Sequence, residues 1–210
     1  MRDTLYNCIE ESVAAPSPDD IVSELGVQLP RSRRLYADYV ANWTPNAIAK
    51  VDGHLYLVGI WVGIPFIIMN LFMTLMCHPK LFPDVGRVDA DEWDDTFSYS
   101  SILSTCQRLR VDSDRRPMLF CDPFPRNQER QCFAMILAIM AIRFVATHER
   151  MHVYRGHLDY LRDKTGQQHI DEFALPLIGG IPMTIRRAFE IDADITSALT
   201  VGNYMRMIAR

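Results

Sequence analysis

The segment Thr147-His148-Glu149-Arg150-Met151-His152 has the residue types and spacing most suited to chemistry in this sequence. His148 and His152 are four residues apart, so on a helix they share one face and can bind one metal ion. Zinc prefers imidazole nitrogen ligands, and a catalytic zinc site keeps one position for water. Glu149 lies between the two histidines and can act as a general base on that water. The pattern therefore predicts a hydrolytic Zn²⁺ site on a helix.

A catalytic zinc site needs a third protein ligand, and three residues are candidates. His157 would require the longer pattern HExxHxxGxxH, but the glycine and histidine that follow His152 are out of register with it. His169 lies in a polar segment without a motif around it. Glu190 is the preferred candidate because Asp194 follows it by four residues, which places both carboxylates on one helix face.

In this interpretation Glu190 binds zinc, while Asp194 accepts a hydrogen bond from a ligating histidine and fixes its tautomer. Asp192, which stands between them, is predicted to point elsewhere. The alternative is an ordinary acidic helix face that pairs with Arg186 and Arg187. The upstream HExxH pattern lacks a third ligand, and this need favours the metal-binding interpretation.

A hydrolytic site also needs a hydrogen-bond donor for the developing oxyanion. Tyr154, His157 and Tyr160 follow the motif closely and have suitable side chains. On an unbroken helix His157 would lie about 140° from His152 and would not face the metal. Gly156 offers a place for the helix to end or bend. The competing interpretation of these three residues is a packed aromatic side chain or a structural histidine.

The surrounding elements alternate between strand-like and helix-like patterns, which predicts an α+β class that is mainly helical with a small sheet. The predicted elements are a buried strand at 51–62, a helix at 66–77, a helix near 98–110, a long helix from about 127 to 161, and a final helix at 184–198. Residues 1–45 are predicted to form an N-terminal arm and residues 46–210 one domain. Residues 89–95 are acidic and predicted to form a solvated loop.

Charge and cysteine content limit the classes of function. The 22 Lys and Arg residues against 26 Asp and Glu give a net charge of −4, which argues against a nucleic-acid-binding protein. The five cysteines are scattered and form no CxxC pair, so they indicate a reducing compartment. The first twelve residues lack the apolar stretch of a secretory signal. Together these features predict a cytoplasmic protein.

Residues 55–77 contain no charged residue and are long enough to span a bilayer. Gly63 and Pro65 interrupt this run and are predicted to divide it into a buried strand and a core helix. An intramembrane metalloprotease is the alternative, but Arg143 and Arg150 in or beside the motif helix would be costly at membrane depth. Membrane association through residues 55–77 is therefore the less favoured interpretation.

The pattern HExxH followed by ExxxD on a later helix resembles the gluzincin metallopeptidases. The longer strings HERMHVYRGHLDYL and RRAFEIDAD are more narrowly similar to the bacterial phage-exclusion peptidases of the Lit-like type. The resemblance implies a zincin-like fold and hydrolysis of peptide bonds in a protein or peptide substrate. It implies His148, His152 and Glu190 as zinc ligands, Glu149 as the catalytic base and Asp194 as the partner of a ligand.

One further expectation comes from this resemblance, and one competing function stays open. The segment Asn46-Ala47-Ile48-Ala49 resembles the upstream strand on which gluzincins lay the substrate backbone. The competing function is a non-catalytic module in which zinc stabilises a sensor or regulatory domain. The two functions differ in whether Glu149 is needed for a hydrolytic activity.

Overall fold

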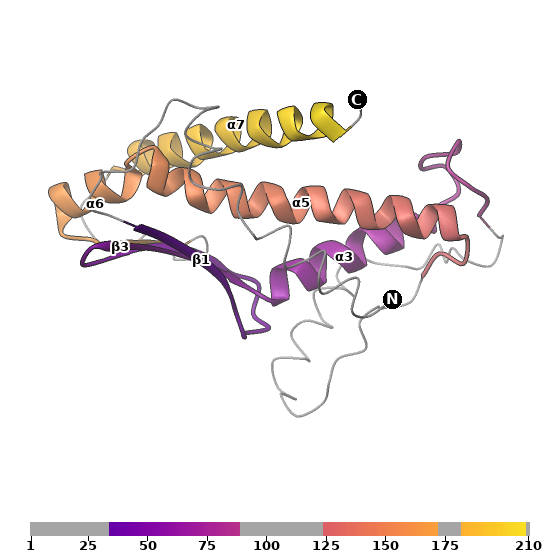
Figure 1. Ribbon diagram of the computed structural model, residues 1–210, viewed down its shortest axis with the longest axis horizontal. Coiled ribbons are helices and arrows are strands. Elements are labelled where there is room, and N and C mark those ends of the chain that lie inside the picture. Colours follow the sequence, from indigo (N-terminus) through magenta and orange to yellow (C-terminus); the bar gives the residue numbers. More distant parts are fainter. Residues whose placement is uncertain (1–33, 89–123, 172–181, 209–210) are drawn as a thin grey trace. The chain divides into compact units, whose positions relative to one another are not determined.

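The computed structural model describes residues 34–88, 124–171 and 182–208 (Figure 1). The elements in these ranges are β1 (Arg34–Val40), β2 (Ala47–Asp52), β3 (Leu55–Trp61), α3 (Gly63–Leu75), α5 (Gln128–Tyr154), α6 (His157–Thr165), β4 (His169–Asp171) and α7 (Met183–Ile208). The predicted α+β class is confirmed. The predicted acidic loop at 89–95 and the helix near 98–110 lie outside the described residues.

The described residues divide into two compact units. The first holds residues 34–39, 46–60, 143–171 and 182–208, and the second holds residues 40–45, 61–88 and 124–142. The first unit contains most of the sheet together with the motif at 147–152, so it is the unit that positions the candidate site.

The sheet has the strand order β1-β3-β2-β4. β2 and β3 form an antiparallel hairpin that pairs Asp52 with Leu55, and the turn uses Gly53 at a φ of +57°, which glycine adopts without steric cost. The single strand predicted at 51–62 is therefore the end of β2, the turn and β3. β4 pairs antiparallel with the other edge of β2. β1 runs parallel to β3. At one end the Arg34 amide donates to the His54 carbonyl oxygen, and at the other end the Val62 amide donates to the Val40 carbonyl oxygen.

The N-terminal boundary differs from the predicted arm, since residues 34–40 form an edge strand of this sheet. In the first unit, the end of α5, α6 and α7 lie on one face of the sheet (Figure 1). The core between them joins buried residues of β2, β3 and β4 to residues of α5 and α6: Ala49, Val51, Tyr56, Val58, Ile170, Val153, Leu158 and Leu161. The Tyr56 hydroxyl also donates to Asp159 of α6 at 2.6 Å. The sheet thus holds the end of the motif helix and the start of α6.

The long predicted helix is two helices. α5 ends at Tyr154, Gly156 adopts a left-handed conformation with a φ of +75°, and α6 begins at His157. A left-handed residue directly after a helix is a common helix terminator and is usually glycine. The break redirects the chain, so the direction of the His157 side chain does not follow the helical spacing of α5. The final helix, α7, is longer than the predicted 184–198.

The uncharged run at 55–77 divides as predicted, with β3 ending at Trp61 and α3 beginning at Gly63. A Cβ atom at Gly63 would lie 2.2 Å from the backbone oxygen of Trp43, so only glycine fits there. α3 has 13 residues, which is too short to span a bilayer.

Arg130, near the start of α5, holds the segment that follows α3. Its side chain is 1% exposed, and its guanidinium donates to the backbone carbonyl oxygens of five residues in that segment: Met76, His78, Leu81, Phe82 and Val85. A guanidinium has five N–H donors, which matches this set of acceptors.

Replacing Arg130 with methionine is expected to lower the free energy of unfolding by roughly 3 to 5 kcal/mol, because several buried carbonyl groups would lose their donors. Urea unfolding followed by circular dichroism measures the change. Arg87→Met removes an exposed arginine and should stay within about 0.5 kcal/mol of wild type. Equal stability of the two variants would show that the Arg130 contacts do not stabilise the fold.

Candidate metal centre

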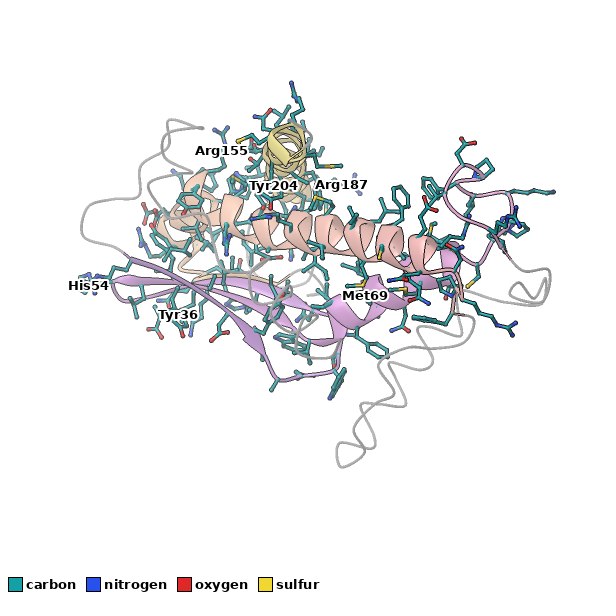
Figure 2. All side chains as sticks on the ribbon, turned by 45° about the vertical axis from the view of Figure 1, so that its right-hand side comes forward. Tyr36, His54, Met69, Arg155, Arg187 and Tyr204 are labelled. Atoms are coloured by element: carbon teal, nitrogen blue, oxygen red, sulfur yellow. The ribbon has the colours of Figure 1, made fainter. Side chains whose placement is uncertain are left out.

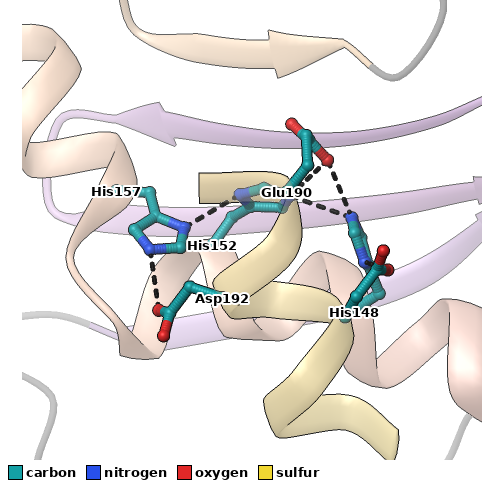
Figure 3. Close-up of polar contacts among 6 residues, drawn as sticks. His148, His152, His157, Glu190 and Asp192 are labelled. Carbon is teal, nitrogen blue, oxygen red and sulfur yellow. Dashed lines mark hydrogen bonds and ion pairs between the residues drawn. The ribbon is translucent and has the colours of Figure 1, made fainter. Parts of the chain in front are cut away.

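Three side chains from two helices converge in the first unit (Figure 3). His148 and His152 lie on α5, and Glu190 lies on α7, 42 residues further along the chain. His148 Nε2 is 3.1 Å from His152 Nε2 and 3.2 Å from Glu190 Oε2. His152 Nε2 is 3.5 Å from the same carboxylate oxygen. The structure therefore brings together the three residues that the sequence analysis assigned as ligands.

The donor atoms have the separations that zinc requires. Tetrahedral zinc with bonds of 2.0–2.1 Å places its ligand atoms about 3.3 Å apart, and the three separations of 3.1, 3.2 and 3.5 Å lie close to that value. Two imidazole nitrogens and a carboxylate oxygen are also the ligand set of a catalytic zinc. His152 is fully buried, whereas the Glu190 side chain is 33% exposed. The residues present thus fit a zinc ion.

Asp194 occupies the place predicted for the partner of a ligand. Its Oδ1 atom lies 2.9 Å from Nδ1 of His148. A hydrogen on Nδ1 that donates to this carboxylate leaves the Nε2 lone pair of His148 directed at the other two ligand atoms. This contact with Asp194 therefore favours the tautomer of His148 that metal binding would need.

His157 contacts His152, the other candidate histidine ligand, at the ring nitrogen that does not face His148 and Glu190. Its Nδ1 atom lies 3.1 Å from Nδ1 of His152, and its Nε2 atom lies 3.1 Å from Oδ2 of Asp192. Arg155 donates to both oxygens of Asp192 at 2.7 and 3.0 Å, and Figure 2 shows Arg155 next to α7. The sequence analysis named His157 as a candidate site residue because of its residue type. Helical spacing did not predict that its ring would face His152.

These contacts correct one expectation and agree with another. His157 was a candidate oxyanion donor, but both of its ring nitrogens are engaged by protein side chains. Asp192 does lie away from the three ligand atoms, as predicted, but it is connected to them through His157. Of the other two candidate donors, Tyr154 lies in a buried cluster with Met151, whereas Tyr160 is 39% exposed and makes an edge contact with Phe189.

Glu149, the predicted base, follows His148 directly on α5 and is 1% exposed. The helix around it is regular, and the Thr147 hydroxyl donates to the Arg143 carbonyl one turn earlier. A buried carboxylate next to His148, a candidate ligand, has the position on the helix that the HExxH pattern assigns to a general base.

Burial and hydrogen bonding act in opposite directions on the ionisable groups. Burial alone would raise the pKa of Glu190, but hydrogen bonds with His148 and His152 outweigh it and lower the pKa to about 2. Glu190 is therefore ionised at neutral pH, as a metal-binding carboxylate needs to be. Burial, with a further contribution from His152, lowers the pKa of His157 to about 4, so its ring is neutral.

The remaining histidines lie elsewhere. His54 lies at the tip of the β2–β3 hairpin (Figure 2), and His78 follows α3. His169, the other candidate for the third ligand, lies on β4 opposite Lys50. Among the residues that the structure describes, Glu190 is the one that joins the two motif histidines in a metal-sized group.

The expected role of residues 46–49 as a substrate strand is contradicted over part of its length. Ile48 and Ala49 pair with β3 on one side and with β4 on the other. A strand with both edges paired has no free backbone groups for a substrate.

Comparison of the chain with protein-family models, with curated proteins and with solved structures found no match. The similarity to gluzincins and to the Lit-like peptidases therefore rests on the motifs, and the geometry described above is the basis for a functional proposal.

Proposed function

We propose that this protein is a zinc-dependent peptidase of the gluzincin type with a zincin-like fold, similar to the bacterial phage-exclusion peptidases. The observation that carries the proposal is the convergence of His148, His152 and Glu190 at zinc-ligand separations. Asp194 and Glu149 add the two supporting groups that such a site uses, a partner for a ligating histidine and a carboxylate base.

The proposed reaction is hydrolysis of a peptide bond in a protein or peptide substrate. A zinc ion held by the three ligands would polarise the scissile carbonyl and lower the pKa of a water molecule to about 7. Glu149 accepts a proton from the attacking water and then donates it to the leaving amine. Glu190 would add one negative charge to the site, and its side chain is 33% exposed.

The metal content and the activity of the purified protein test this proposal together. Elemental analysis should find one zinc ion per chain, and the protein should cleave a denatured protein substrate in a reaction that a chelator stops and added zinc restores. A protein without zinc contradicts the proposed site. Bound zinc without cleavage of a broad substrate panel contradicts the peptidase and supports a non-catalytic sensor or regulatory module.

One observation favours a second location for the same chemistry. Of the helices in the described ranges, α5 is long and apolar enough to cross a membrane, and 33% of its most apolar window is buried. The core helix of a soluble protein passes the same test, so we propose the cytoplasmic peptidase first and a membrane-associated metalloprotease second. Recovery of the zinc-loaded protein without detergent supports the first, and recovery from the membrane fraction alone supports the second.

A further inference from the structure

The two candidate histidine ligands contact different partners through their Nδ1 atoms. His148 contacts the carboxylate of Asp194 directly at 2.9 Å. His152 contacts a third imidazole, His157, which in turn contacts the carboxylate of Asp192 (Figure 3). The sequence motif accounts for the first arrangement and does not include the second.

One arrangement of hydrogen atoms satisfies the second set of contacts when His152 binds a metal. His152 then uses the lone pair of Nε2, so its hydrogen is on Nδ1 and is donated to Nδ1 of His157. His157 accepts at Nδ1, and its own hydrogen is therefore on Nε2. That hydrogen faces Oδ2 of Asp192, a carboxylate that accepts hydrogen bonds.

The surroundings of His157 hold the ring in this orientation. Its side chain is 5% exposed and stacks on Phe189, with ring centroids 4.3 Å apart and planes inclined by 12°. Gly156 sets the direction from which the ring enters. Asp192 is restrained from the other side by its two hydrogen bonds with Arg155. The contacts thus connect α5, α6 and α7 behind one metal ligand.

We propose that His157 and Asp192 are positioning residues that fix the tautomer and the ring orientation of His152. With its hydrogen on Nε2, His152 could not bind the metal, because that nitrogen would have no free lone pair. The inference rests on the metal-binding part of the proposed function and is independent of peptide hydrolysis. At His152, a His–His–Asp chain of contacts thus takes the place of the direct carboxylate contact that His148 has.

The first test compares two replacements of His157 by their zinc affinity, measured by competition with a chromophoric chelator. His157→Phe keeps a ring that can stack on Phe189 but lacks both nitrogens, and it should weaken zinc binding by about 10- to 100-fold. His157→Gln retains an oxygen that can accept from His152 and an amide that can donate to Asp192, so it should bind more tightly than His157→Phe. Thermal unfolding of the metal-free variants confirms that each is folded.

The second test asks whether the two residues act through one chain of contacts. Asp192→Ala should weaken zinc binding, and the double variant with His157→Phe should bind no more weakly than His157→Phe alone, since the Asp192 contact passes through His157. Asp163→Ala is the matched control, because it removes an exposed carboxylate of α6 that pairs with Arg162. This control should bind zinc as wild type does.

A spectroscopic measurement reports the tautomers directly. Nitrogen-15 NMR of the zinc-loaded, histidine-labelled protein should show His157 with its hydrogen on Nε2 and His152 with its hydrogen on Nδ1. His157 with its hydrogen on Nδ1, or wild-type zinc affinity in His157→Phe, overturns the inference. These results differ from failure of the peptidase proposal, in which zinc binds with the expected dependence on His157 but no substrate is cleaved. A wild-type protein that binds no zinc overturns both.

Discussion

Glu149→Gln is expected to lower the rate of peptide hydrolysis by about 10²- to 10⁴-fold while the zinc content stays at one ion per chain. Glutamine has nearly the same shape as glutamate, but its amide cannot accept a proton from water at neutral pH. Glu149 is 1% exposed and is not among the three ligand residues. The substitution should therefore separate proton transfer from metal binding, and the measurements are cleavage of a denatured protein and elemental analysis of the same preparation.

Glu129→Gln is the matched control for this prediction, because Glu129 is an exposed glutamate in the first turn of the same helix. It should retain both zinc and activity. Wild-type hydrolysis by Glu149→Gln would exclude Glu149 as the base, whereas a loss of zinc in this variant would show that the carboxylate contributes to the metal site itself.

Removal of any one ligand is expected to reduce zinc affinity by more than 100-fold, which exceeds the effect of losing an outer contact. The informative variant in the series is Glu190→Ala. Zinc loss in the two histidine variants would be expected whichever residue is the third ligand, whereas zinc loss in Glu190→Ala identifies Glu190 as that ligand. His148→Ala and His152→Ala give the reference loss. Zinc content after dialysis against a weak chelator measures all three, with activity measured in parallel.

His169→Ala is the control for the ligand series, because His169 was the competing third-ligand candidate and lies on β4 opposite Lys50. It should bind zinc as wild type does. Retention of zinc by Glu190→Ala together with its loss in His169→Ala would move the third ligand to β4 and contradict the assignment of Glu190.

The arrangement of the ligand histidines was predictable because it is local. Residues four apart on a helix share a face whatever surrounds the helix, so the pair His148 and His152 follows from the chain alone. The same reasoning relates Glu190 to Asp194, which contact the same histidine from one face of α7. The division of the uncharged run at Gly63 was also local, since glycine and proline interrupt a strand or helix at their own positions.

Tertiary structure alone decided how α7 meets α5, because the contact joins residues 42 positions apart and depends on packing that no short pattern encodes. It also decided the role of His157. Helical spacing directs this ring away from the site, but the left-handed conformation of Gly156 ends the helix and brings His157 to 3.1 Å from His152. Sequence spacing thus determined which residues of one helix could act together, and the end of that helix at one glycine determined which further residue joins them.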